Sequence, residues 1–202
     1  MKHLKQIDLA RLKPGFSNPV LETQQTFRAV LDAMSHPGRV IRLAAELNPP
    51  TPLHRASAAL CLTLLDFETA LWADLDESSQ TIDWLRFHCG CPLTEDPFRA
   101  TFALITRAKA MPTIQEFCPG EAARPDLSTT LIIQAAELGS PNGSEILGPG
   151  IESKVTLGVN GIADNFWKQW HAQTELYPLG TDVVFTAGNS ILALPRTSRL
   201  VA

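Results

Sequence analysis

A helix that must end abruptly is the strongest structural signal in the chain, and it occupies residues 23–38, TQQTFRAVLDAMSHPG. Pro37 disfavours helical geometry at the residue before it, and Gly38 leaves the backbone free to turn. The apolar residues recur at spacings of three and four, so they share one predicted helix face. They are Phe27, Val30, Leu31 and Met34. We therefore expect a helix that packs through this face, a sharp corner, and a strand at residues 39–43.

The first half of the chain then alternates predicted helices and strands, a pattern that favours parallel strand pairs. Residues 53–66 are apolar nearly all round, as in a helix buried against a sheet or a second subunit. Another helix is expected to begin near Asp76, whose carboxylate favours a helix start, and to end near Gly90. Strands are predicted at residues 69–73 and 100–106.

The second half carries turn signals that favour antiparallel pairs, at residues 141–143 and 188–189. The first of these turns is expected to return a strand at 144–147 beside a strand at 129–137. The remaining predicted elements are the strands 155–159, 182–185 and 191–194 and a helix that follows Asp164 and Asn165. The predicted fold is α/β, a three-layer sandwich whose mixed sheet has helices on both faces.

The bulk composition suits one soluble domain of 202 residues, with 45% hydrophobic and 19% charged residues. We assign residues 1–19 to an N-terminal arm, which drapes over the body or a partner or else is disordered, and 20–202 to a single α/β domain. The net charge of −4 argues against a general nucleic-acid binder, since phosphate contacts need a clustered basic surface. No apolar run reaches the length of a membrane span, and the basic N-terminus lacks the apolar stretch of a secretory signal. The four cysteines therefore fit reduced thiols in the cytoplasm.

Seven segments, in their order and spacing, resemble the H subunit of bacterial carbon–phosphorus lyase over nearly the whole chain. They are Gln24-x-x-Phe27-Arg28 and the segments 33–38, 85–88, 100–103, 147–151, 177–182 and 192–197. Two mild departures are Tyr177, where Phe is expected, and Thr181, where Ile is expected.

The resemblance implies a fold similar to the large domain of pyridoxal-phosphate-dependent transferases, without that cofactor. It also implies a subunit that works with the G, I and L components to transfer the ribose 5-triphosphate of ATP onto an alkylphosphonate, displacing adenine. Subunit J then breaks the carbon–phosphorus bond, and K is a further partner. None of the six lysines stands in the context expected of a Schiff-base lysine, and we predict no cofactor.

A homodimer is also expected. The helix at 53–65, together with Trp167 and Trp170, holds more apolar surface than a single small sheet must cover.

No catalytic residue is predicted, but six residues of these segments are candidates for ligand binding or subunit contacts: Arg28, Ser35, Arg86, His88, Arg196 and Thr197. A guanidinium suits phosphate or phosphonate oxygens because its fork is planar and always charged, and it suits a carboxylate across a subunit contact equally well. The histidine is either a core or interface residue or a ligand. The serine, which has no Gly-x-Ser-x-Gly elbow, is expected to hydrogen-bond the last turn of its helix.

Two other functions remain open. One is a free-standing transferase that holds a phosphoryl group through the candidate arginines. The other is a small zinc protein, although the usual second pair of ligands is missing. Its ligands would be His88, Cys89, Cys91 and Cys118. The backbone amides of Gly148-Pro149-Gly150 could cradle a phosphate, but no Lys-Ser or Lys-Thr follows, so a turn between strands is the expected structure.

Overall fold

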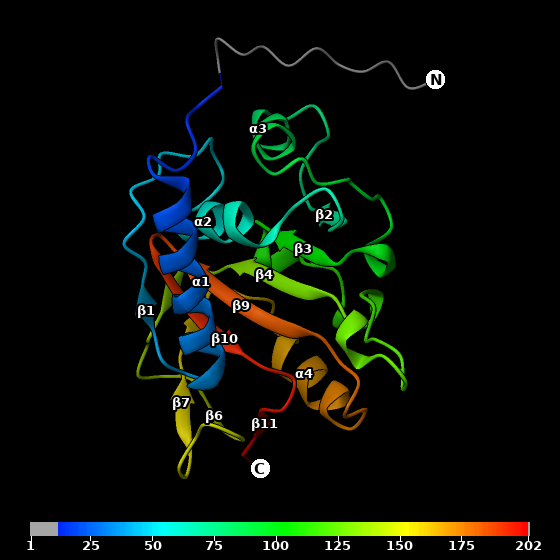
Figure 1. Ribbon diagram of the computed structural model, residues 1–202. Coiled ribbons are helices and arrows are strands. Elements are labelled where there is room, and N and C mark those ends of the chain that lie inside the picture. The colour runs from blue at the N-terminus through cyan, green and yellow to red at the C-terminus, as the bar shows by residue number, and fades with distance from the viewer. Residues whose placement is uncertain (1–11, 202) are drawn as a thin grey trace.

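A mixed six-stranded sheet runs through the middle of the molecule in the computed structural model, which describes residues 12–201 (Figure 1). In spatial order its strands are β1 (Ile41–Arg42), β10 (Ser190–Leu194), β9 (Asp182–Ala187), β4 (Thr130–Gln134), β3 (Phe102–Ile105) and β2 (Leu71–Ala73). The α-helices of the described residues are α1 (Pro19–Ser35), α2 (Arg55–Leu64), α3 (Gln80–Cys89) and α4 (Phe166–Thr174). Short 3-10 helices lie at Pro97–Arg99, Ala108–Ala110, Ile114–Glu116 and Pro125–Leu127.

Parallel and antiparallel pairing divide the main sheet. Strands β2, β3, β4 and β9 pair in parallel, whereas β9, β10 and β1 pair antiparallel. The predicted mixed sheet and the β9–β10 hairpin are thus confirmed, but parallel pairing extends further along the chain than expected. The pairing of the expected strand 144–147 was wrong, because both edges of β4 are already occupied by β3 and β9.

That segment instead enters a small sheet of its own. Strand β6 (Ser144–Leu147) pairs with β7 (Val155–Leu157) on one side and with β11 (Arg199–Leu200) on the other. A further pair joins β5 (Glu137–Leu138) to β8 (Val159–Asn160). The small sheet therefore places the C-terminal strand β11 beside β6, although the two are far apart in sequence.

Two cores lie on opposite faces of the main sheet because successive side chains of a strand alternate. In β4, Ile132 points into the core under α1, α2 and α3, while Leu131 and Ile133 point into the core that α4 and the small sheet cover. In β9, Val184 and Phe185 divide in the same way. Figure 1 shows this arrangement as three layers, with α4 and the small sheet on the face opposite α2 and α3.

Helix α1 buries only part of the predicted face, since Val30 is buried and Met34 packs against the core. Its buried residues are Thr26, Val30 and Ala33, whereas Phe27 is 46% and Leu31 is 53% exposed. The apolar stripe of the sequence is broader than the contact, and the small Ala33 side chain allows α1 to lie close against its neighbours. The spacing correctly predicted the helix but included two residues that face solvent.

Helix α2 is buried as predicted, but within its own chain. Residues 56–61 all lie below the surface, and Trp170 of α4 is fully buried in the second core. Most of the apolar surface on which the homodimer was predicted is therefore already covered inside one chain, although Trp167 is only partly buried.

The first described residues lie against the body of the molecule. The carbonyl oxygen of Lys13 accepts a hydrogen bond from Trp84 Nε1 at 2.9 Å, and His88 Nε2 lies 3.0 Å from the same oxygen. Asn18 then caps α1, since its side chain accepts from the backbone N–H of Leu21. Residues 1–11 of the predicted arm lie outside the described residues. None of the helices between residues 12 and 201 combines the length and apolar character needed to cross a membrane.

Candidate functional site

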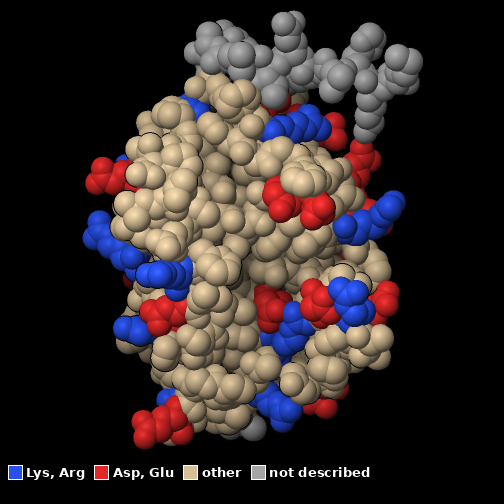
Figure 2. All heavy atoms as spheres, viewed as in Figure 1, with Lys and Arg blue, Asp and Glu red and all other residues tan. Residues whose placement is uncertain are grey.

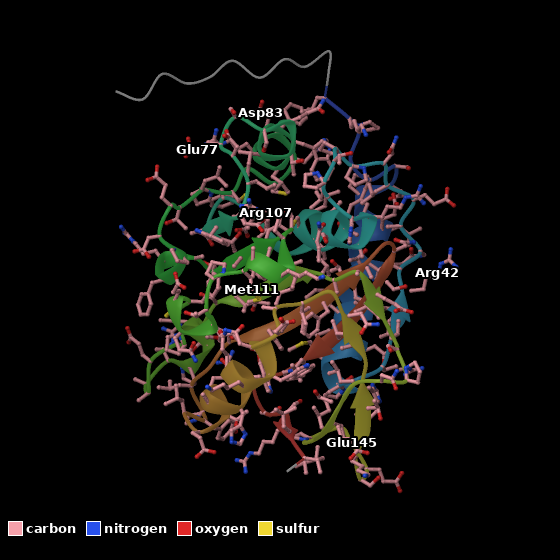
Figure 3. The ribbon with its side chains drawn as sticks, turned by 180° about the vertical axis from the view of Figure 1, so that it is seen from behind. Arg42, Glu77, Asp83, Arg107, Met111 and Glu145 are labelled. Atoms are coloured by element: carbon pink, nitrogen blue, oxygen red, sulfur yellow. The ribbon has the colours of Figure 1, made fainter. Side chains whose placement is uncertain are left out.

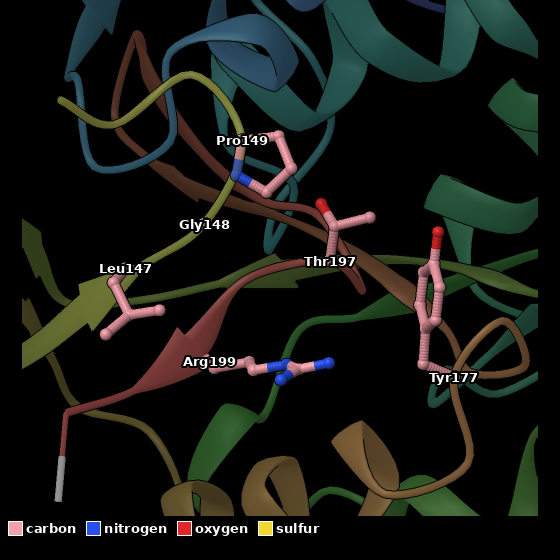
Figure 4. A pocket seen from close by; sticks show the side chains of 6 residues that line it. All are labelled: Leu147, Gly148, Pro149, Tyr177, Thr197 and Arg199. Carbon is pink, nitrogen blue, oxygen red and sulfur yellow. The ribbon is translucent and has the colours of Figure 1, made fainter.

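A hollow of about 250 Å³ opens where three segments distant in sequence meet. The three segments are 147–151, 177–182 and 192–197 of the pattern described above. Arg199, which also lines the hollow, comes just after the last of them. The described residues that line the hollow are Leu147, Gly148, Pro149, Tyr177, Thr197 and Arg199 (Figure 4). The fold thus gathers at one point residues that the sequence spreads over fifty positions.

Strand pairing holds the first two sides of the hollow together. Arg199 of β11 stands directly opposite Leu147 of β6 in the antiparallel register. The turn after β6 then passes close to the segment before β11, because a Cβ on Gly148 would lie 3.0 Å from the carbonyl oxygen of Thr197. Glycine at this position permits the close approach that forms the wall.

The turn also contacts the end of α1. A Cβ on Gly150 would lie only 2.1 Å from the carbonyl oxygen of Ser35 and 3.3 Å from Pro37, and the residue has a φ of +81°. Only glycine tolerates both the contact and this conformation. The Gly148-Pro149-Gly150 segment is therefore a turn between β6 and β7, as expected, and it rests against the corner that ends α1.

Arg196 does not face the hollow but clamps the neighbouring strands. Its guanidinium pairs with Asp182, and it donates to the Pro125 carbonyl oxygen at 2.7 Å and to the Ser128 hydroxyl. Its own backbone N–H donates to Asp182 at 2.8 Å. The predicted carboxylate partner of this arginine thus exists, but within the same chain.

Free donors remain in the hollow itself. Among the described residues that line it, Arg199 alone is charged, and its side chain is exposed and forms no hydrogen bond or ion pair with the described residues. The hydroxyl groups of Tyr177 and Thr197 have no partner within the same part of the chain. In Figure 4 the guanidinium extends from β11 toward Tyr177 and lies beneath Thr197. The arrangement leaves one cation and two hydroxyl groups available to a ligand.

Of the six predicted candidates, only Thr197 lines this hollow. Arg28 is exposed on α1, and Arg86 lies on α3. His88 packs on Trp84, with ring centroids 4.8 Å apart, and helps to hold the segment at Lys13. Sequence reasoning missed Arg199, because its proximity to Leu147 follows from strand pairing between positions that carry no local signal.

Ser35 and His36 do come within hydrogen-bond distance, although they do not form a catalytic pair. The serine hydroxyl lies 3.1 Å from His36 Nδ1 and also 3.1 Å from the Asp32 carbonyl oxygen, the helix-end contact that we expected. The same Nδ1 atom lies 2.9 Å from the Asp32 carboxylate. A serine–histidine–aspartate triad uses the two ring nitrogens for different partners, and here one nitrogen meets both.

The four proposed zinc ligands are not brought together as a set, although the side chains of Cys89 and Cys91 lie close to each other. Among residues 12–201, no group of three or more His, Cys, Asp or Glu side chains could hold a metal ion. Cys91 belongs to the core beneath α1–α3, whereas Phe117, next to Cys118, belongs to the core on the opposite face. Cys61, which lies near Cys89, is fully buried, and burial raises the pKa of its thiol.

A second hollow, of about 320 Å³, lies past the carboxyl ends of β3 and β4. His54, Arg107, Lys109 and Gln134 are among the described residues that line it. The His54 Nδ1 atom is buried without a hydrogen-bond partner in the described part of the chain, and burial lowers the pKa of this imidazole. Arg107 donates to the backbone carbonyl of Asp74 and pairs with its carboxylate. The arginine of the first hollow, Arg199, has no such partner among the described residues.

Comparison with known proteins adds to this geometry. The family model described as "Bacterial phosphonate metabolism protein (PhnH)" matches residues 14–201. The chain is 36% identical, over 92% of its own length and 94% of the relative's, to the alpha-D-ribose 1-methylphosphonate 5-triphosphate synthase subunit PhnH of Rhizobium meliloti (strain 1021). It is 29% identical, over 88% of its length and 85% of the relative's, to the putative C-P lyase subunit protein HtxG of Stutzerimonas stutzeri.

Proposed function

Because the chain belongs to the PhnH family of bacterial phosphonate metabolism proteins, we propose that it is a subunit of an assembly that breaks down organic phosphonates. The observation that carries this proposal is the 36% identity to a named synthase subunit over nearly the full length of both chains. The second relative, named as a C-P lyase subunit, supports the same class of assembly.

In this proposal the chain acts with G, I and L components when the ribose 5-triphosphate of ATP is transferred to an alkylphosphonate. In the same proposal component J later breaks the carbon–phosphorus bond, and K is a further partner. The name of the Rhizobium relative, a subunit of a ribose methylphosphonate triphosphate synthase, supports the first reaction. The use of ATP supports a cytoplasmic location.

The site geometry favours a supporting role over independent catalysis. The three candidate arginines lie on different elements, and none of them lines either of the two hollows described above. Arg196 is bound to Asp182, and the Ser35–His36 contact lacks the geometry of a nucleophile with its base. A free-standing transferase would need one of these groups in a different place.

We also retain the likeness to the large domain of pyridoxal-phosphate-dependent transferases as a proposal about the fold. The mixed sheet with its parallel strands and two-sided helical cover supports it. No internal aldimine should be detected by absorbance in the purified protein.

Helix α1 offers a surface for subunit contacts. Val20, Phe27 and Leu31 follow one another at spacings of seven and four, so they form one exposed stripe along the helix. Val20 is 84% exposed. Figure 2 shows Lys, Arg, Asp and Glu scattered over the face that α1 occupies, without a continuous patch of either sign. We propose that a second copy of the chain covers this stripe, which replaces α2 as the basis for the homodimer.

Affinity purification of the tagged chain from its native host tests the proposed function. The expected result is stoichiometric recovery of other phosphonate-assembly subunits, identified by mass spectrometry. Recovery of the chain without any such subunit, at an expression level matched to the host's own, would contradict the proposal.

A further inference from the structure

We propose that the hollow between β6 and β11 binds an organic phosphorus oxyanion, with Arg199 as its charged ligand and with the short organic substituent against Leu147 and Pro149. The choice of phosphorus rests on the proposed function, whereas the choice of an anion rests on the hollow itself. A volume of about 250 Å³ suits a small ligand such as an alkylphosphonate.

The charge at the site comes from Arg199. Arg196, three residues earlier, is neutralised by Asp182, so the two arginines have different roles although they are close in sequence. Arg199 keeps its five N–H donors free of the described residues. A planar guanidinium binds two oxygens of a phosphonate or phosphate at once, and hydrogen bonds to an ionised group are stronger than neutral ones.

A hydroxyl group, that of Thr197, adds to the anion-binding side. In Figure 4 Thr197 lies between Pro149 and Arg199, with its hydroxyl on the side of Pro149, and this hydroxyl has no partner among the described residues. The position of Thr197 is held by its contact with Gly148. A tetrahedral anion offers three oxygens, and so it can accept from the guanidinium and from a hydroxyl group together, which a planar carboxylate does less well.

The remaining wall is apolar. Leu147, Pro149 and the ring of Tyr177 present carbon atoms to the hollow. Such a wall favours an anion that carries an alkyl group over inorganic phosphate, since each buried CH₂ adds favourable transfer free energy. The affinity should therefore rise from inorganic phosphate to methylphosphonate and again to propylphosphonate.

Nitrogen-15 NMR titration of the full chain tests the site with four probes: inorganic phosphate, methylphosphonate, propylphosphonate and acetate. Saturable shifts are expected at the amides of Gly148 and Arg199, with propylphosphonate the tightest ligand. Arg199→Gln should weaken propylphosphonate binding about tenfold or more, since it removes charge-assisted hydrogen bonds. Arg199→Lys, which keeps the charge without the fork, should give an intermediate loss.

Arg42→Gln is the matched control. Arg42 is another exposed arginine on a strand, and Figure 3 shows it projecting from the edge of the main sheet that β1 forms. Its replacement should leave every probe affinity unchanged. Equal affinity in wild type and Arg199→Gln, or absence of saturable shifts at the hollow, would overturn the proposal. Acetate binding as tightly as methylphosphonate would overturn the assignment to phosphorus, and phosphate binding as tightly as propylphosphonate would overturn the apolar subsite.

The same variants separate this proposal from the proposed function. Arg199→Gln should still recover the other subunits from the native host, because the exposed side chain holds no part of the fold. Loss of anion binding with intact recovery supports both proposals. Recovery of partners by a wild-type chain that binds no probe would overturn the anion site alone, and probe binding without partners would overturn the proposed function alone.

Discussion

Arg196 and Asp182 form a mostly buried ion pair, with side chains 15% and 16% exposed, that joins the end of β10 to the start of β9. The carboxylate accepts from the guanidinium and, at 2.8 Å, from the backbone N–H of Arg196. This double attachment fixes the backbone from which Thr197 and Arg199 reach the hollow. A residue predicted to contact a ligand or a partner thus positions the site from within its own chain.

Replacing Arg196 by Ala should reduce the free energy of unfolding by about 3 kcal/mol, because it strands a mostly buried carboxylate. Urea unfolding followed by circular dichroism measures the loss. Arg124→Ala is the control, since the Arg124–Asp126 pair is exposed and should contribute little. An Arg196→Ala protein as stable as the wild type would contradict the clamp.

Replacing Gly150 by Ala should destabilise the chain more than the same change at Gly90. Both glycines have positive φ, so both substitutions incur the cost of a left-handed conformation, about 1–2 kcal/mol. At Gly150 the new Cβ would also collide with the Ser35 carbonyl oxygen, whereas at Gly90 it would meet nothing within 4 Å. Equal losses in urea unfolding would show that the turn does not press against the end of α1.

Part of the loss of stability as the pH is lowered should come from His54. Burial lowers the pKa of this imidazole below its ordinary value of 6.5, so the unfolded chain binds more protons as the pH drops through that value. The stability attached to neutral His54 is complete above about pH 6.5 and is lost as the pH falls toward the lower folded-state pKa.

When the pH is lowered from 7.5 to 5, the melting temperature should therefore fall less in His54→Gln than in the wild type. Thermal unfolding at both pH values measures the difference. His171→Gln, at an exposed position of α4, controls for the loss of a histidine as such. The same pH dependence in wild type and His54→Gln would show that the buried ring does not contribute.

Replacing Phe27 by Glu should convert the proposed homodimer to a monomer without unfolding it, since Phe27 is half exposed on α1. Light scattering coupled to size exclusion gives the mass. Phe87→Glu, at an exposed phenylalanine of α3, should leave the dimer intact. A monomeric wild type at micromolar concentration, or a dimeric Phe27→Glu protein, would show that α1 is not the interface.

Local signals in the sequence predicted those parts of the fold that depend on neighbouring residues. The turn at Gly188-Asn189 correctly predicted the β9–β10 hairpin, because a tight turn determines which strands pair. Pro37 and Gly38 likewise marked the end of α1 at Ser35. The apolar run at 53–66 correctly indicated a buried helix.

Long-range pairing lay beyond such signals. Nothing local to β6 indicates that β7 and β11 are its partners, since the choice depends on β4 having both edges occupied. The hollow could not be predicted for the same reason, because the pairing of Leu147 with Arg199 creates it. On α1 the helical spacing could not show which part of a wide apolar surface meets the core and which part stays exposed.

Adenine release from ATP in the presence of methylphosphonate tests the subunit proposal most directly. The measurement compares a mixture of the G, I and L components with the same mixture plus this chain, and with this chain alone. The proposal predicts release only when the chain and the other components are combined. Release by the chain alone, in proportion to its concentration, would contradict the subunit proposal and support a free-standing transferase.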